Sequence, residues 1–298
     1  MHDTAPAIGV RPVSRGMHVL LYVLTALTFF AGTQLFVLSD HTETFFSWTI
    51  LNPMSAAFIG AGFWGASVVV FWCARQRAWT RGRVVVPTVA VVATMLMVGT
   101  LQNLEAFHGL LGLAWIEVYS LFPPILAAIT IMQLIVPGSD PHSGDRLPGG
   151  LRLTLAAQGV VAIVVGVLLF ASSPSLAADL WAWKLTDLTS KAVGTWMVGT
   201  GVTCAVVALL DDRAALPGWA LAQMTLGAAV LFGLARFGGD VDFDDASAYL
   251  IVIYFASTLA SGAYGALLSW REGRFAPTRG VGGIPVETRM PVESVNTG

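Results

Sequence analysis

Long apolar blocks, separated by short polar segments, dominate the pattern along this chain. Eight blocks reach roughly 18 residues or more with few charges, the length that an α-helix needs to cross the hydrocarbon core of a bilayer. The sequence therefore predicts eight transmembrane helices. Their expected bounds are Met17–Leu38, Pro53–Cys73, Val84–Leu101, Leu111–Val136, Leu151–Ala171, 188–210, Ala214–Ala235 and Ala246–Trp270.

Local signals refine three of these helices. Asn52 suits an N-cap and Pro53 suits the first helical position, so the second helix should begin there. Asp187 suits the same capping role for the sixth helix. Pro123 and Pro124 fall inside the fourth helix, where they remove two backbone donors and predict a kink.

An internal repeat organises the chain. Trp48, Asn52, Ser55 and Ala57 recur as Trp183, Asp187, Ser190 and Ala192, each 135 positions later, and Tyr119 and Tyr254 keep the same offset. Four passes per half is an even number, so both halves would enter the bilayer from the same side. The predicted fold class is all-α: a polytopic membrane bundle of eight transmembrane helices, built as a parallel 4+4 internal repeat.

The expected domain organisation follows from this repeat. The two four-helix repeats should span 15–136 and 151–270, joined by a linker at 137–150 that is rich in Pro, Gly and Ser. The polar segments 1–14 and 271–298 are expected to be disordered tails.

Composition agrees with a membrane protein. Of 298 residues, 55% are hydrophobic and only 11% are charged, against about a quarter in soluble domains. The net charge of −2 gives no basic field for nucleic acid. Cys73 and Cys204 lie in apolar blocks and are interpreted as small buried hydrophobes. The preference for arginine over lysine, with much Ala, Val and Gly, suggests a bacterial genome rich in GC.

The basic residues predict the topology. Thirteen of the 16 Lys and Arg residues fall in the two tails, the linker, and the loops after the second and sixth helices. The other three are Lys184, Lys191 and Arg236. By the positive-inside rule, both termini should be cytoplasmic in a multi-pass protein of the cell membrane.

Aromatic residues cluster in the two echoing loops: Phe45, Phe46, Trp48, Trp181 and Trp183. Tryptophan is enriched at membrane interfaces whatever the function of the protein, so interfacial anchoring is the favoured interpretation. Stacking on a ligand is the alternative.

Ionisable groups near membrane depth are functional candidates by default. Glu105 and His108 lie at the external mouth, Glu117 lies about two turns into the fourth helix, and Arg236 ends the seventh on the same side. We interpret these four as a candidate polar ligand site, in which Arg236 could pair with Glu117 or Glu105. For Glu117, a structural or interface-reaching role is the alternative.

Metal and cofactor chemistry has little support. Asp240, Asp242 and Asp244 resemble the start of a calcium loop, but the required glycine and glutamate do not follow, so they suggest at most a loose cation contact. Glu105 and His108 have di-iron spacing without the second motif, and His18 and His108 lie on opposite sides for haem. No catalytic residue, metal or cofactor is predicted.

Three functions fit this pattern. A small transporter or permeation module is favoured by the duplication and by the proline break. A non-catalytic scaffold or accessory subunit is favoured by the lack of buried charge, and it predicts a packed bundle without a central cavity. An intramembrane enzyme would need a convergent site, which the sequence lacks. The bilayer is the expected partner, and nucleic acid is not.

Overall fold

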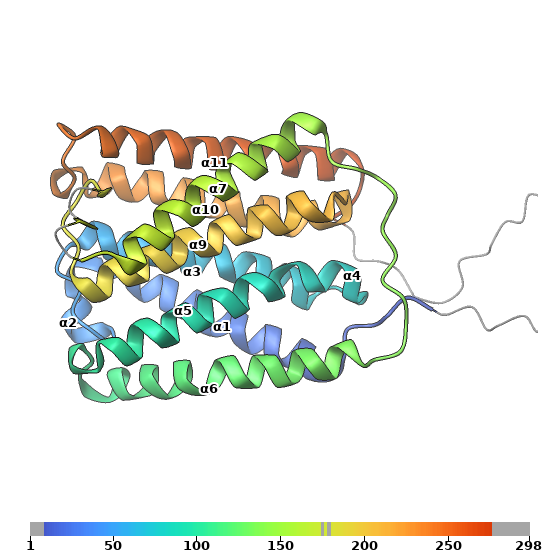
Figure 1. Ribbon diagram of the computed structural model, residues 1–298, viewed down its shortest axis with the longest axis horizontal. Coiled ribbons are helices and arrows are strands. Elements are labelled where there is room, and N and C mark those ends of the chain that lie inside the picture. Colours follow the sequence, from blue (N-terminus) through green and yellow to red (C-terminus); the bar gives the residue numbers. More distant parts are fainter. Residues whose placement is uncertain (1–8, 174–175, 178–179, 276–298) are drawn as a thin grey trace, which may run out of the picture.

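The computed structural model describes residues 9–173, 176–177 and 180–275 of the chain. These residues form an elongated helical bundle (Figure 1) in which eight helices are long and apolar enough to cross a membrane. This is compatible with a multi-pass membrane protein. The long helices are α1 (Arg15–Val37), α3 (Pro53–Ala74), α5 (Val86–Gln102), α6 (Gly109–Leu134), α7 (Gly149–Ala171), α9 (Asp187–Leu210), α10 (Leu216–Arg236) and α11 (Ala246–Arg271).

Short elements complete the bundle. The turn α2 (Thr42–Phe45) follows α1, and α4 (Trp79–Gly82) with the 3₁₀ turn η2 (Arg83–Val85) leads into α5. A matching 3₁₀ turn, η4 (Arg213–Ala215), leads into α10. Both described ends of the chain leave the bundle on the same side, at the right of Figure 1. We call that side the termini end and the opposite side the loop end.

Two helices, α3 and α9, form the centre of the bundle. Helix α3 packs against α1 and α10, whereas α9 packs against α7 and α5. The outer partners are α6, which packs on α5, and α11, which packs on α10. Most side chains of α3 and α9 are buried, whereas α6 exposes most of its surface.

Paired glycines set the closest helix contacts. A Cβ on Gly60 of α3 would lie 3.0 Å from the carbonyl oxygen of Gly32 on α1. A Cβ on Gly194 of α9 would lie only 2.5 Å from the carbonyl oxygen of Gly166 on α7. Larger side chains at these positions would separate the helices, so the glycines allow backbone-to-backbone packing where lipid supplies no hydrophobic drive for association.

The helix starts agree in part with the sequence signals. Asn52 caps α3 by accepting from the Ser55 N–H, and Pro53 stands at the first helical position, as predicted. For α9 the predicted cap is wrong by one residue: Thr186 is the N-cap and accepts from the Thr189 N–H. Asp187 instead forms an ion pair with Lys191 one turn later. Helix α6 continues as one helix through Pro123 and Pro124.

The described segment before α1, residues 9–14, is held against the bundle. Its backbone pairs with two other segments at the termini end: Arg11 N–H donates to Ser139, and Trp79 N–H donates to Arg11. The Gln133 side chain of α6 accepts from the Ser14 N–H and donates to the Pro12 carbonyl. Residues 9–14 of the expected tail 1–14 are thus held by hydrogen bonds, and residues 1–8 lie outside the described part.

The segment 137–150 is held at both ends. Ser139 donates to the Gly9 carbonyl, and the Leu147 N–H donates to the Asp211 carboxylate. Asp212 also binds this segment: burial opposes ionisation of its carboxyl, but hydrogen bonds from Ser143 and from the Ala214 N–H outweigh that effect and hold its pKa below the usual value. In the C-terminal tail, 271–275 are described and 276–298 are not.

The aromatic residues of the two loops fill the core instead of lining the membrane interface. Phe46, Trp48, Trp181 and Trp183 are at most 5% exposed, and only Phe45 is exposed. Trp48 packs edge-on against Trp115 of α6 with ring centres 5.0 Å apart. The Trp183 indole N–H donates to the Ser55 hydroxyl of α3 at 2.8 Å. The predicted anchoring role is therefore wrong for these four side chains.

Candidate functional site

The four residues of the predicted polar site do not meet. His108 contacts the Thr49 hydroxyl at 3.2 Å, and Glu105 stays exposed at the loop end. Glu117 is also exposed, on the outer surface of α6. None of the interactions found among the described residues joins Glu105 or Glu117 to another of the four.

Arg236 has partners of its own. Its guanidinium donates to the Phe36 carbonyl at 3.0 Å, lies 3.7 Å from the Asp40 carboxylate and stacks over the Phe237 ring. These contacts tie the end of α10 to the end of α1. Arg236 thus serves there as a link between helix ends and pairs with neither Glu117 nor Glu105.

The acidic loop forms local turns. The Asp242 N–H donates to the Ala182 carbonyl, and the Asp242 carboxylate accepts from the Asp244 N–H. The Asp240 carbonyl accepts from the Asn52 side chain. Across the described residues, no three His, Cys, Asp or Glu side chains gather to hold a metal ion.

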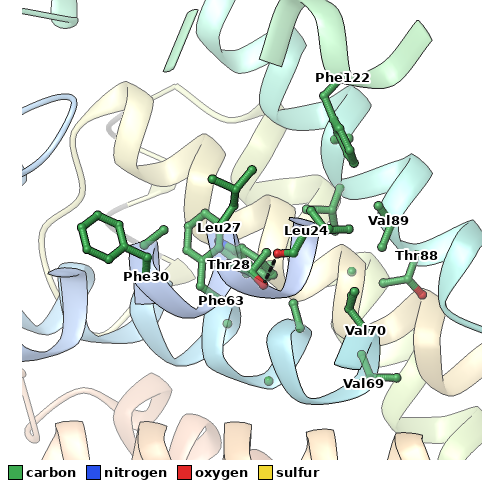
Figure 2. A pocket seen from close by; sticks show the side chains of 18 of the residues that line it. Leu24, Leu27, Thr28, Phe30, Phe63, Val69, Val70, Thr88, Val89 and Phe122 are labelled. Carbon is green, nitrogen blue, oxygen red and sulfur yellow. Dashed lines mark hydrogen bonds between the residues drawn. The ribbon is translucent and has the colours of Figure 1, made fainter. Parts of the chain in front are cut away.

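A cavity of about 290 Å³ lies between α1 and α6. Its inner wall comes from α3, α5, α9 and α10. Figure 2 shows Leu24, Leu27 and Thr28 of α1 facing Val70 of α3 and Phe122 of α6 across this space. Its volume lies at the lower edge of the range for small-molecule pockets, ~300–1,000 Å³.

The cavity opens sideways, through the seam between α1 and α6. Leu27 and Phe30 of α1 line it and are 52% and 63% exposed on the outside of the bundle. Leu111 and Val118 of α6 also line it and are exposed. A bundle with these helices across a bilayer would therefore open the cavity to the lipid chains.

None of the side chains that line the cavity is charged. Glu117 is absent from the lining, although its neighbours Val118 and Tyr119 belong to it. An isolated charge in such a space would lack a counter-ion and would cost several kcal/mol. The chemistry of the cavity therefore suits an uncharged, mostly apolar occupant.

A few uncharged polar groups interrupt the apolar wall. Thr28, Thr200 and Thr203 each donate to a carbonyl within their own helix, three or four residues earlier. Thr88 of α5 lies 2.9 Å from the Thr203 hydroxyl of α9. Gln223 of α10 donates to the Cys204 sulfur, which leaves its carbonyl oxygen without a partner.

The opposite seam, between α7 and α11, is closed by hydrogen bonds. The Gln158 side chain of α7 donates to Ser257 at 3.0 Å and accepts from Ser261 at 3.3 Å. The Tyr254 hydroxyl donates to the Gln158 backbone carbonyl. Along α1, by contrast, Leu24 and Leu27 face the cavity. The described helices thus form one tied seam and one open seam.

An ion pair within α9 was also missed in the sequence analysis. Lys191 lies 2.5 Å from Asp187, and its side chain is only 12% exposed. It lies beside Trp48, Gly99 and Trp115 at the loop end. The i,i+4 spacing of the two residues was the available signal.

Comparison with known proteins gives no relative. No protein-family model matches the chain, and neither a curated protein nor a solved structure is significantly similar to it.

Proposed function

We propose that the protein is a small transport module of the bacterial cell membrane and that it takes up a lipophilic molecule through the seam between α1 and α6. The observation that carries this proposal is the uncharged cavity that opens sideways between these helices. A lipid-dissolved molecule could reach such an opening without passing through water.

The same cavity helps to choose among a transporter, a scaffold and an enzyme. A packed scaffold predicts no internal space, whereas this bundle holds about 290 Å³. A carrier for a polar solute needs convergent polar groups, yet Glu117 faces outward and Arg236 pairs with Asp40. An enzyme needs an acid, a base or a metal, and the cavity wall is uncharged.

Photolabelling tests the proposal. A long-chain alkane that carries a diazirine should label Phe63 and Leu226, which line the cavity and are at most 7% exposed. Ala31→Phe fills part of the cavity, so labelling of these two residues should fall by about tenfold, as expected when a site loses roughly 1.4 kcal/mol of binding. Peptide mass spectrometry measures the labelled fraction.

Ala26→Phe provides the matched control, because Ala26 lies on α1, is exposed and does not line the cavity. Labelling should be unchanged in that variant. Equal labelling in the wild type and in Ala31→Phe, or labelling confined to exposed residues such as Val164, would contradict the proposal.

We further propose that the bundle is a parallel duplication of a four-helix unit with both termini cytoplasmic. Several pairs support this. The glycine contacts Gly32–Gly60 and Gly166–Gly194 are 134 residues apart, and α5 and α10 each begin with a 3₁₀ turn and a proline. Helices α6 and α11 each have 26 residues. The contacts of α3 with α10 and of α9 with α5 would be equivalent.

Cysteine labelling on intact cells tests both statements. With Cys73 and Cys204 replaced by alanine, His41→Cys and Lys184→Cys should react with a membrane-impermeant maleimide. Arg146→Cys, 86% exposed as arginine at the termini end, should react only after lysis. Reaction of one loop-end position but not the other would rule out the parallel repeat, and the reverse pattern would invert the topology.

A further inference from the structure

We propose that the start of α1 and the end of α3 together bind the headgroup phosphate of an anionic phospholipid. The site lies at the termini end and consists of Arg15, His18, Arg75 and Arg77, none of which lines the cavity. Three features point to it: arginines without a counter-ion, the bonding of both ring nitrogens of His18, and an exposed apolar strip beside these charges.

Six arginines of the termini end are paired with acidic side chains. Asp140 pairs with Arg11 and Arg83, Asp211 with Arg146 and Arg152, and Glu272 with Arg213 and Arg274.

The arginines at the start of α1 and the end of α3 are different. Arg15, Arg75 and Arg77 are exposed, and none of them has an ion pair within the described part of the chain. Arg271 shares both properties but lies on α11, which packs on α10 and α7. Positive charge therefore remains without a counter-ion where α1 begins and α3 ends.

Backbone contacts bring these charges together. The Val13 N–H donates to the Arg77 carbonyl at 2.9 Å, and Val13 precedes Arg15 by two residues. Because two residues of chain span at most about 7 Å, the long side chains of Arg15 and Arg77 can reach one phosphate group. Guanidinium groups bind phosphate through paired, charge-assisted hydrogen bonds. The fold thus joins two segments that are far apart in sequence into one cationic surface.

His18 adds a charge to this surface. Its Nδ1 lies 3.1 Å from the Ser14 carbonyl oxygen, and its Nε2 lies 3.1 Å from the Gln76 carbonyl oxygen. Carbonyl oxygens only accept, so both ring nitrogens must donate, and only a protonated imidazole has two N–H groups. Positive charges this close together repel one another. A bound anion would remove that repulsion and stabilise the link between α1 and α3.

An exposed apolar strip beside the charges favours a lipid over a free anion. The Arg75 guanidinium stacks over the Phe71 ring, 5.7 Å from its centre, and Phe71 meets Tyr22 edge-on with ring centres 6.4 Å apart. Phe71 is 43% exposed and Tyr22 is 47% exposed. Arg15, His18 and Tyr22 follow one another at i, i+3 and i+7, so they share one face of α1. A phosphate bound at Arg15 would therefore place an acyl chain along Tyr22 and Phe71.

Lipid binding to the purified full-length protein in detergent tests this proposal. The probes are phosphatidylglycerol and phosphatidylcholine with the same acyl chains, and native mass spectrometry measures the dissociation constant of each. Phosphatidylglycerol should bind about tenfold more tightly, because phosphatidylcholine carries its own cation beside the phosphate. In Arg15→Gln and in Arg77→Gln this preference should fall to about threefold or less, and in the double variant it should disappear.

Arg271→Gln is the matched control, because it removes an exposed and unpaired arginine from another helix of the same end. It should keep the full preference. Equal losses in Arg271→Gln and Arg15→Gln would reveal a general attraction to the positive end and overturn the proposal, as would equal binding of the two lipids by the wild type. Phe71→Ala should weaken the binding of both lipids and leave the preference intact.

Inorganic phosphate separates a lipid site from a site for a free anion. It offers the same charged oxygens without an acyl chain, so at a concentration equal to that of phosphatidylglycerol it should not displace the lipid. Displacement at equal concentration would show that the chain contributes nothing along Tyr22 and Phe71, and the assignment to a lipid would then be wrong.

Discussion

Replacement of Gly194 by leucine should destabilise the bundle by more than about 3 kcal/mol, beyond the usual cost of an overpacked core. The new Cβ would stand 2.5 Å from the Gly166 carbonyl oxygen and 2.8 Å from the Phe170 nitrogen. Both are backbone atoms, so no side chain can rotate away, and α7 would have to leave α9. The midpoint of thermal unfolding, followed by circular dichroism in detergent, measures the loss.

Gly150→Leu is the control for this substitution. Gly150 lies in the first turn of α7, and a Cβ there would meet nothing within 4 Å. That variant should unfold at the wild-type temperature or above it, since leucine favours the helix more than glycine does. A Gly194→Leu protein as stable as Gly150→Leu would show that α7 and α9 do not touch at this glycine pair.

Replacement of Trp183 by alanine should cost about 3–5 kcal/mol, the range for removing a large buried aromatic side chain. Its ring packs against Trp181 and Phe58, and its N–H donates to the Ser55 hydroxyl of α3. The substitution would leave a void that lipid cannot fill. Equilibrium unfolding in a mixed-micelle denaturant series measures the loss.

Two further variants separate the effect of burial from the effects of the hydrogen bond and of an interfacial position. Trp183→Phe keeps an aromatic ring but loses the indole N–H and part of the ring volume, so its cost should be smaller, about 1–2 kcal/mol. Trp270→Ala removes a side chain that is 70% exposed and should change stability little. An equal effect of Trp183→Ala and Trp270→Ala would support interfacial anchoring after all and contradict the burial described here.

Much of the architecture could be predicted because apolar length is a local property of a sequence. The eight spans appear close to their predicted places, and Asn52 and Pro53 start α3 as their chemistry requires. Two glutamines bond between helices: Gln158 reaches α11 and Gln223 reaches α9. Gln34 and Gln133 bond to segments outside the long helices instead.

The aromatic loops could not be predicted because two environments produce the same sequence pattern. A tryptophan beside an apolar block fits a headgroup layer and a folded-back loop equally well. The difference lies in distant contacts, such as Trp48 with Trp115 and Trp183 with Ser55. No local signal encodes these pairings.

The cavity escaped prediction for a different reason. Reasoning from charge selects residues such as Glu117 and Arg236, but the cavity is lined by uncharged, mostly apolar side chains. Such side chains carry no local signal, and only the arrangement of six elements around one space reveals the cavity.

The short segment before α1 also constrains how the protein matures. Its main chain pairs with Ser139 and with Trp79, and the Gln133 amide holds Pro12 and Ser14. Synthesis proceeds from the N-terminus, so these partners emerge from the ribosome long after residues 9–14 do. Residues 9–14 therefore stay undocked until α6 has been synthesised. Their docking marks the completion of the first four long helices.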